Sequence, residues 1–440
     1  MRVFVGPVEI AGYYGQLAAA LRQIGVDAVS VDLSDHPFRY GRAERTSMWI
    51  AAATWAERRS KAARGGPRSV KTMWRGLQVI TRVALLGWSI WRFDTFIFGF
   101  GKTLLFGLDL PLLRLFRKRL IFSFNGTDAR PPYIDGADMA ASRGTTVDEC
   151  IRMTRHKKAQ IRRIERYADA IVGMPMFSHF FERPIVDFFR VGLPLMPANM
   201  SEGRQDGGGE VRILHSPSDP EVKGSERIRA TVEAMSAAGQ RLRLIELREV
   251  TNETVRAEIA RADFVIDQLY SDIPMAVFPA EAAAAGVPAI VGSYAWPELR
   301  RLYGDGALAP VEQCHPDGLT AAIDRLSNDR EHRLAMGARA RAFVEDQWAA
   351  QRVAERYLTI LRGEAPAEWH FDPNALRYVH GVGLPEQRSR EIVAAVLERG
   401  GRNALQLVDK PALEQAFVDF AGAGDVPDRP AQVTTRAGFP

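Results

Sequence analysis

The chain has 440 residues, of which 46% are hydrophobic and 25% are charged. This composition excludes a disordered, fibrous or largely membrane-embedded protein and suits two globular domains of roughly 200 residues each. The two cysteines, Cys150 and Cys314, lie far apart and match neither a disulfide framework nor a metal-binding spacing, which favours a reducing compartment. The first residues, MRVFVGPVEI, lack the basic start and long apolar run of a signal peptide, so we expect a cytoplasmic protein.

Charge is divided unevenly along the chain. Residues 1–200 contain 30 Lys and Arg against 17 Asp and Glu, whereas residues 201–440 contain 28 against 36. A basic first half indicates an anionic partner, for which nucleic acid, an anionic membrane surface and a phosphorylated acceptor all qualify.

The first half alternates strands with helices. Between the first two strands, the loop GPVEIAGYYG leads into a helix with Leu17, Leu21 and Ile24 on one face. The fourth strand ends in the polar turn NGTDARPPY, and a charged helix follows at Asp148–Tyr167. The predicted strands are Arg2–Val5, Val26–Leu33, Phe93–Phe98 and Leu120–Phe124.

The basic charge is concentrated in residues 58–92. Seven cations and no acid lie between Arg58 and Arg75, and an apolar, Trp-containing segment follows. Its uninterrupted apolar run, between Arg82 and Arg92, is far shorter than the roughly 20 residues that a membrane-spanning helix needs. Two interpretations stay open: a helix lying in the interface of an anionic membrane, or a core helix with a solvated basic flank.

The second half repeats the alternation after a break. The polar, Gly-rich stretch SEGRQDGGGE, residues 201–210, is the predicted domain linker. Alternating strands and helices predict parallel sheets with right-handed crossovers. The predicted strands are Val211–His215, Leu242–Leu247, Phe264–Leu269 and Pro288–Gly292, and the predicted helices lie at Ser225–Ala238, Asn252–Arg261, Ala280–Ala285 and in three stretches between Pro316 and Leu361.

The end of the chain differs in composition. An aromatic loop at Trp369–Phe371 precedes YVHGVGLPEQ and two short helices. We therefore expect four parts: an N-terminal domain (1–200), a second domain (201–362), a helical extension (363–420) and a disordered tail (421–440).

Several local patterns occur together in a fixed order. They are IAGYYGQLAAALRQIGVDAV, FGLDLPLL, FSFNGTDAR, LHSPSDPEVKGSE, ARADFVIDQL and AEAAAAGVPAIV. On these patterns the chain resembles the GT-B glycosyltransferases, in particular the retaining, nucleotide-sugar-dependent group called family four. The resemblance covers roughly residues 2–360 and implies an α/β fold with two Rossmann-like domains facing each other across a cleft. It places the acceptor domain first and the nucleotide-sugar donor domain second.

Candidate donor-binding residues follow the strands of the second half. Lys223 stands at a helix entry, where its charge adds to exposed N–H groups, and the resemblance assigns it to the donor pyrophosphate; a solvated surface lysine is the alternative. Glu281 corresponds to the glutamate that binds the ribose hydroxyls, with a helix-dipole role as the alternative. His215 and Ser216 face the same rim, and His215 is not expected to be catalytic. The loop from Tyr270 to Val277 should offer backbone N–H groups to the phosphates through Tyr270, Met275, Ala276 and Val277.

The first half contributes its own candidates. Gly12, on the first strand–helix loop, would let the backbone approach a diphosphate or a sugar. Asn125, Thr127, Asp128 and Arg130 sit on the rim after a strand, with Asp128 and Asn125 as catalytic candidates and Arg130 as an acceptor contact; local turn formation is the alternative. Asp128 and Arg130 are close enough in sequence to pair.

Two positions depart from the pattern of the family. Many relatives have a pair of glutamates around the donor loop, but the earlier position is Ile273 here, with Asp272 as the nearest acid. A common first-domain histidine is replaced by Asn125. These changes leave open a subgroup with altered sugar contacts, weak activity, or a binding-only descendant of the fold.

No metal-binding motif is present, so we expect helix termini and basic side chains to neutralise the leaving diphosphate without a metal or other cofactor. The predicted function is sugar transfer from a nucleotide diphosphate-sugar to a glycan or lipid-linked acceptor, in surface polysaccharide or glycolipid synthesis. Residues 58–92 would contact the inner face of the cell membrane. Alternatives are a non-catalytic nucleotide- or glycan-binding scaffold and a nucleotide-sugar epimerase. A nucleic-acid partner is not expected, because no groove-reading module is recognisable.

Overall fold

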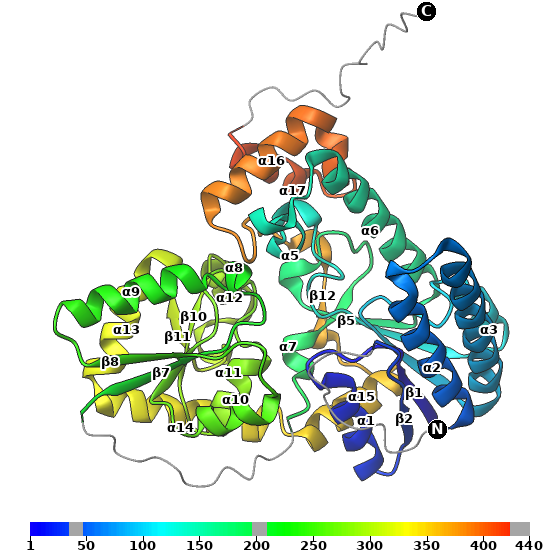
Figure 1. The fold of residues 1–440 in the computed structure, drawn as a ribbon, viewed down its shortest axis with the longest axis horizontal. Coiled ribbons are helices and arrows are strands. Elements are labelled where there is room, and N and C mark those ends of the chain that lie inside the picture. Colours follow the sequence, from blue (N-terminus) through cyan, green and yellow to red (C-terminus); the bar gives the residue numbers. More distant parts are fainter. Residues whose placement is uncertain (35–46, 196–208, 423–440) are drawn as a thin grey trace, which may run out of the picture.

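The computed structural model describes residues 1–34, 47–195 and 209–422, which form two parallel-sheet units side by side, with a pair of helices above them (Figure 1). Most of the predicted linker and almost all of the predicted tail lie outside the described residues. The domain boundaries named from the sequence therefore stay predictions at those two places.

The first sheet has seven strands in the order β12-β6-β5-β4-β3-β1-β2. All neighbours pair in parallel except β12, which runs antiparallel to β6. The central strands are buried along nearly their whole length, as expected for a parallel sheet covered on both faces. The strands are β1 (Arg2–Gly6), β2 (Asp27–Ser30), β3 (Thr95–Gly99), β4 (Arg119–Ser123), β5 (Ala170–Gly173), β6 (Ile185–Asp187) and β12 (His370–Phe371).

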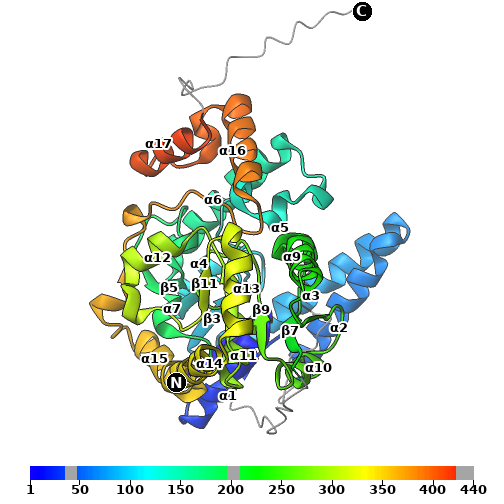
Figure 2. The same cartoon turned by 90° about the vertical axis from the view of Figure 1, so that its left-hand side faces the viewer.

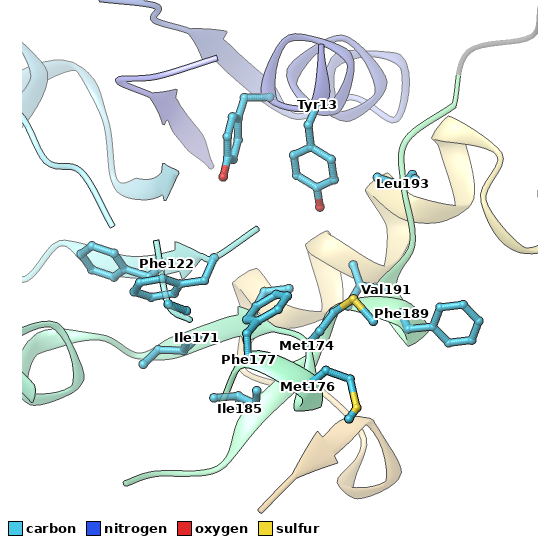
Figure 3. Packing of buried hydrophobic residues seen from close by; sticks show 14 of the residues in the cluster. Tyr13, Phe122, Ile171, Met174, Met176, Phe177, Ile185, Phe189, Val191 and Leu193 are labelled. Carbon is cyan, nitrogen blue, oxygen red and sulfur yellow. The ribbon is translucent and has the colours of Figure 1, made fainter. Parts of the chain in front are cut away.

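Helices cover both faces of this sheet. The longest helix of this unit is α3, and the second longest is α6. Helix α6 begins at a capping box formed by Thr146 and Glu149. Figure 3 shows part of the core, where Tyr13 of α1 lies near apolar side chains of β4, β5 and the segment after β5. The helices of the first half are α1 (Tyr13–Gln23), α2 (Met48–Ala62), α3 (Arg68–Arg92), α4 (Leu110–Leu115), α5 (Gly136–Met139), α6 (Val147–Tyr167) and α7 (Phe188–Val191).

The second sheet has five parallel strands in the order β11-β10-β9-β7-β8. Its strands and helices confirm the predicted alternation, with ends that differ from the prediction by a few residues. The elements are β7 (Val211–His215), α8 (Pro220–Lys223), α9 (Ser225–Ala237), β8 (Leu242–Glu246), α10 (Asn252–Ile259), β9 (Phe264–Ile266), α11 (Val277–Ala284), β10 (Ala289–Gly292), α12 (Trp296–Tyr303), β11 (Glu312–Cys314), α13 (Leu319–Asn328) and α14 (Arg330–Gln347).

The order of strands reverses once in each sheet. The chain passes from β1 to β2 on one side and then to β3 on the other, and it passes likewise from β7 to β8 and then to β9. Loops that leave neighbouring strands in opposite directions open a crevice at the carboxyl ends, where open α/β sheets bind ligands. The two such points are β1/β3 in the first sheet and β7/β9 in the second.

After α14 the chain returns to the first unit. Helix α15 (Ala350–Arg362) packs against α1, where the hydroxyls of Tyr13 and Tyr357 are 2.7 Å apart. The predicted boundary at residue 362 thus separates α15 from the sheet on which it packs. The aromatic loop predicted at Trp369–Phe371 is wrong in part, because His370 and Phe371 form β12 and extend the first sheet. Two helices follow, α16 (Glu386–Gly400), which packs on α6, and α17 (Pro411–Phe420), which packs on α16 (Figure 2).

Helix α3 has one buried face and one exposed apolar face, and its membrane contact stays a prediction. Arg82, Leu85, Leu86 and Ser89 form a buried face. The opposite face exposes an apolar stripe that includes Met73, Ile80, Val83 and Trp91. Within the described ranges, no helix has both the length and the apolarity to cross a bilayer.

Candidate functional site

The strongest candidate lies at the β7/β9 switch point of the second sheet. Lys223, at the end of the short helix after β7, places its Nζ 3.1 Å from Oδ1 of Asp267, the residue that follows β9. The Asp267 side chain is 3% exposed and that of Lys223 is 18% exposed. Oδ2 of Asp267 is buried without a hydrogen-bond partner within the described part of the chain. The solvated-lysine alternative is therefore wrong, since Lys223 is largely enclosed and paired.

Two helix N-termini flank this ion pair. Helix α9 starts after Gly224, which has a φ of 73° and offers no side-chain cap. Helix α11 starts after Ala276, which also lacks a side-chain cap. Helices that begin without a capping side chain leave first-turn N–H groups free for an anionic ligand. The segments after β7 and β9 thus supply an ion-paired lysine and two uncapped helix starts.

The loop after β9 only partly matches the predicted row of phosphate-binding amides. The amide of Ser271 donates to the carbonyl of Gly292, and that of Ile273 donates to the Ser271 hydroxyl. The Tyr270 ring is buried, and the Tyr270 carbonyl accepts from the amide of Gly383. Met275, Ala276 and Val277, at the start of α11, are therefore the part of the loop that suits the predicted role.

Glu281 lies on α11, half-buried, and both of its carboxylate oxygens accept from the side-chain amide of Asn252, at 3.1 and 3.2 Å. Burial raises the pKa of Glu281, and the bond from Asn252 acts in the opposite direction. Asn252 opens α10, after β8. A carboxylate held by a neutral amide keeps lone pairs for a vicinal diol, which fits the predicted ribose contact. No contact joins Glu281 to Lys223 within the described residues.

His215 ends β7 and is fully buried. Its Nδ1 lies 2.8 Å from the carbonyl of Ile266, which can only accept, so Nδ1 donates and Nε2 accepts from the Ser225 hydroxyl. Burial lowers the pKa of His215 and keeps it neutral. These hydrogen bonds hold β7 against β9 and α9. This is a structural role, in line with the expectation that His215 is not catalytic. Ser216 follows at the rim and is half-buried.

On the first sheet, Asp128 organises the loop after β4. Its carboxylate accepts from the amides of Asn125 and Gly126, and the Asn125 side-chain oxygen accepts from the Tyr14 hydroxyl at 2.8 Å. Burial raises the pKa of Asp128 to about 6. The turn-forming alternative named from the sequence therefore applies here, and it does not prevent the free edge of the carboxylate from meeting a ligand.

Arg130 does not pair with Asp128 as expected. Its guanidinium donates to Asp272 at 2.7 Å and to Asp135 at 3.0 Å, and all three side chains are buried. Asp272 belongs to the donor loop of the second unit, so this cluster joins the two units. Asp272, the acid next to Ile273 in the sequence, thus contacts Arg130. Ile273, which stands where many relatives have a glutamate, is partly buried against the core. The predicted acceptor contact of Arg130 stays a prediction.

Gly12 precedes α1 with a φ of 81°, a conformation that favours glycine. The amides of Tyr14 and Gly15, in the first turn of α1, donate to the carboxylate of Glu9. Burial raises the pKa of Glu9 to about 7. A buried carboxylate thus occupies the helix start at which the sequence suggested a diphosphate or a sugar, so Gly12 has a structural reason for its presence, and its binding role stays a prediction.

The C-terminal segment reaches the same rim. Tyr294, after β10, stacks between Tyr270 and His380, at ring-centre distances of 6.0 and 5.4 Å. The Tyr294 hydroxyl accepts from the amide of Glu386 at 3.1 Å. The segment between His380 and Glu386 therefore borders the donor loop, a contact that nothing in the sequence pattern indicated.

Sequence reasoning missed Asp267, Asn252 and Tyr14, although weak signals exist for the first two. Asp267 is an acid at the end of an apolar strand, and Asn252 is a polar residue at a helix start. Within the described part of the chain, no group of His, Cys, Asp or Glu side chains is arranged to hold a metal ion. The predicted independence from metals stays a prediction.

Fold and site define an α/β protein with two sheet units, the GT-B arrangement, and an ion-paired lysine at the switch point of the second sheet. Residues 227–359 match the model of the family described as glycosyl transferase-like. This match runs from within α9 to within α15 and includes Asp267 and Glu281. No curated protein matches the chain.

Solved structures with a similar arrangement include HepE of Anabaena, crystallised with UDP and glucose. It has 10% identity and a TM-score of 0.46, and the similarity covers 82% of this chain and 99% of that one. The glycotransferase of kitacinnamycin has 12% identity, 83% and 99% coverage and a TM-score of 0.42. A UDP-GlcNAc 2-epimerase from Methanocaldococcus jannaschii has 10% identity, 82% and 98% coverage and a TM-score of 0.40.

Proposed function

We propose that the protein transfers a sugar from a nucleoside diphosphate-sugar to an acceptor hydroxyl. The observation that supports this most strongly is the position of Lys223 at the β7/β9 switch point, paired with Asp267 and just ahead of residues 227–359, which match the glycosyl transferase-like family. Such a crevice suits a diphosphate, whose charge grows as the sugar departs.

Each residue then has a distinct task. Lys223 and the N–H groups at the start of α11 stabilise the leaving diphosphate. Asp267 holds the Lys223 ammonium group toward the crevice until the donor arrives. Glu281 accepts hydrogen bonds from the ribose, and Asn252 keeps its carboxylate in place. Asp128 and Asn125, on the facing unit, contact the acceptor.

The finer assignment rests on the resemblance to family four. On that basis we propose hexosyl transfer with retention at the anomeric carbon, in surface polysaccharide or glycolipid synthesis on the cytoplasmic side of the membrane. The anomeric configuration of an isolated product, measured by NMR, tests retention directly.

Thermal-shift titration with UDP and GDP tests the donor site without knowledge of the acceptor. We expect one of these nucleotides to raise the melting temperature of the wild type. Lys223→Ala and Glu281→Ala should remove most of that shift, because they delete the diphosphate and ribose contacts. Arg243→Ala, at an exposed position of β8, and Glu253→Ala, at an exposed position of α10, are matched controls that should keep it.

If both site variants keep the full shift, or if no nucleoside diphosphate stabilises the wild type, the assignment of the crevice fails. A shift without turnover would instead favour the binding scaffold. That second candidate is motivated by Ile273, which places an apolar, partly buried side chain where many relatives have an acid. Mass spectrometry of the donor after incubation separates the two functions.

A membrane partner is part of the proposal, through the exposed stripe of α3. Ile80 is 65% exposed and Trp91 is 76% exposed, on the face opposite to the buried one. Arg68 and Arg75 lie on the same helix, in the basic region that precedes the apolar segment. Apolar side chains beside cations suit an anionic lipid surface, where burial and charge act together.

Sedimentation with liposomes tests this surface. We expect the protein to bind vesicles that contain anionic lipid and not neutral vesicles. Ile80→Asp combined with Val83→Asp should abolish binding, because both positions are exposed and the fold does not depend on them. Val408→Asp, at a position that is 76% exposed on the C-terminal extension, is the control. Equal binding of both variants would exclude α3 as the contact.

A further inference from the structure

A cavity of 430 Å³ lies on the first unit, where α6 passes over the loops that follow β3 and β4. Phe100 and Lys102 line it from the first loop, Thr127 and Asp128 from the second, and α6 contributes one face. It therefore opens at the carboxyl ends of two neighbouring parallel strands, the edge at which such sheets bind ligands. Its size suits one sugar with a substituent.

The basic side chains around this cavity are not equivalent. Lys157 is fully engaged, because its ammonium group donates to the carbonyls of Thr127 and Arg130 and lies 3.4 Å from Asp138. Lys102 and His156 have no such partner among the residues that the structure describes. Arg152 approaches only Glu149, at 3.9 Å, and both of these side chains are exposed. Lys102, Arg152 and His156 thus border the cavity and have hydrogen-bond donors available for a ligand.

The remaining lining includes Asp138, whose carboxylate pairs with Lys157, and side chains that suit a carbohydrate. Phe100 and Met153 supply apolar surface, against which the C–H face of a sugar ring can pack. Asp128 supplies a carboxylate that the amides of Asn125 and Gly126 hold in a fixed orientation. Two residues further along the same loop, Arg130 contacts Asp272 of the donor loop, so the cavity adjoins the contact between the two units.

We propose that this cavity binds an acceptor sugar that carries an anionic group, a phosphate or a carboxylate. Lys102, Arg152 and His156 receive the anion, since charge-assisted hydrogen bonds to such groups are stronger than neutral ones. Asp128 accepts a hydrogen bond from a ring hydroxyl. The role as acceptor rests on the proposed transferase function, whereas the binding of an anionic sugar does not.

Isothermal titration calorimetry with glucose 6-phosphate, glucuronate and glucose tests the cavity on the full chain. We expect at least one of the anionic sugars to bind roughly tenfold more tightly than glucose, a difference of about 1.4 kcal/mol. The double variant Lys102→Gln with His156→Gln should lose this preference. Arg155→Gln is the matched control, because Arg155 lies on α6 beside His156, is exposed and does not line the cavity.

Comparison of the affinities for glucose 6-phosphate and glucuronate distinguishes a phosphate ligand from a carboxylate ligand. The inference is overturned if glucose binds as well as both anionic sugars, if none of the three binds, or if the double variant behaves like Arg155→Gln. A parallel titration with UDP keeps the two proposals apart. If the wild type binds UDP but shows no preference for an anionic sugar, the cavity proposal alone is refuted. If the wild type shows that preference but does not bind UDP, the donor-site proposal alone is refuted.

Discussion

Folding makes ionisation of the Asp128 carboxyl group less favourable than it is in the unfolded chain. Burial raises its pKa from 3.8 to about 6, although the amides of Asn125 and Gly126 stabilise the charged form. A raised folded-state pKa means that the protonated form is favoured by folding. The stability that this group contributes is complete below about pH 4 and is lost as the pH rises through about 6.

We therefore predict that the wild type loses stability relative to Asp128→Asn between about pH 4 and about pH 7. The asparagine side chain keeps an oxygen that can accept from the same amides but does not ionise. Urea denaturation at several pH values measures the difference between the two proteins. Other buried acids, such as Glu9, titrate equally in both proteins and cancel. Asp346→Asn, at an exposed carboxylate, should show no such trend, and a flat difference for Asp128→Asn would contradict the prediction.

At the same scale, the sequence located side chains but not their partners. Lys223 was predicted at a helix entry and Glu281 on a helix, and the structure has them there, because strand ends and helix starts are visible in local patterns. Their partners Asp267 and Asn252 lie 44 and 29 residues away along the chain, and only the strand order brings them close. The expected pair of Asp128 with Arg130 failed for a related reason, since Asp272, 142 residues from Arg130, takes that guanidinium.

At the scale of elements, the segment between His380 and Glu386 is packed too closely for larger residues. Gly383 has a φ of +65°, and a Cβ placed on it would lie 2.4 Å from Cγ1 of Val222. The carbonyl of Val382 accepts from the amide of Gly136, and the amide of Gly383 donates to the carbonyl of Tyr270. The segment thus lies between the first unit and the donor loop, and it approaches Val222, the residue that precedes Lys223.

Gly383→Ala should accordingly destabilise the protein more than Gly144→Ala. Gly144 has a similar φ of +62° but nothing near its Cβ, so it reports the backbone cost alone, about 1–2 kcal/mol. The contact with Val222 adds about 1–3 kcal/mol at position 383. Chemical denaturation compares the free energies of unfolding of the two variants. Equal losses would mean that Val222 moves aside freely.

Elements also differ in how far the sequence predicted them. Long periodic segments such as Asp148–Tyr167 and apolar strands such as Val211–His215 were predicted within a residue or so, because their patterns are local. The two-residue strand β12 was not, since only pairing with β6 stabilises it. Helix α3 was ambiguous because both of its faces are apolar, and the neighbouring elements decide which face is buried.

At the scale of the whole molecule, the two units meet through a buried charge cluster of one cation and two acids. Arg130 pairs with both Asp135 and Asp272, so removing it leaves two buried carboxylates without a counter-ion. Removing one partner of a buried ion pair lowers the free energy of unfolding by more than the intact pair contributes to it, because the remaining charge stays buried and unpaired.

Arg130→Met is therefore expected to lower the free energy of unfolding by about 3–5 kcal/mol. Asp272→Asn should cost less, because it leaves Arg130 with Asp135 and an amide that can still accept. Arg399→Met, which breaks the exposed pair with Asp148, should leave the urea midpoint nearly unchanged and serves as the control. Urea denaturation followed by circular dichroism measures all three. A mild effect of Arg130→Met would imply that water reaches the cluster.

The overall architecture was predictable from the alternation of strands and helices and from the resemblance, both of which indicated two parallel sheets. The path of the chain after α14 was not. Helix α15 carries the periodicity of any amphipathic helix, and nothing in that pattern says that it packs on α1 rather than on the second sheet. Contacts of this kind depend on surfaces that exist only once both units have folded.

The late return of the chain has a consequence for biosynthesis. Tyr357, β12 and α16 complete the first unit, yet the ribosome makes them only after every strand of the second sheet. The N-terminal sheet therefore emerges with its β6 edge unpaired and part of its apolar surface bare. During translation it must wait for a whole neighbouring unit to form, an interval in which a chaperone that shields nascent strands would raise the yield of active protein.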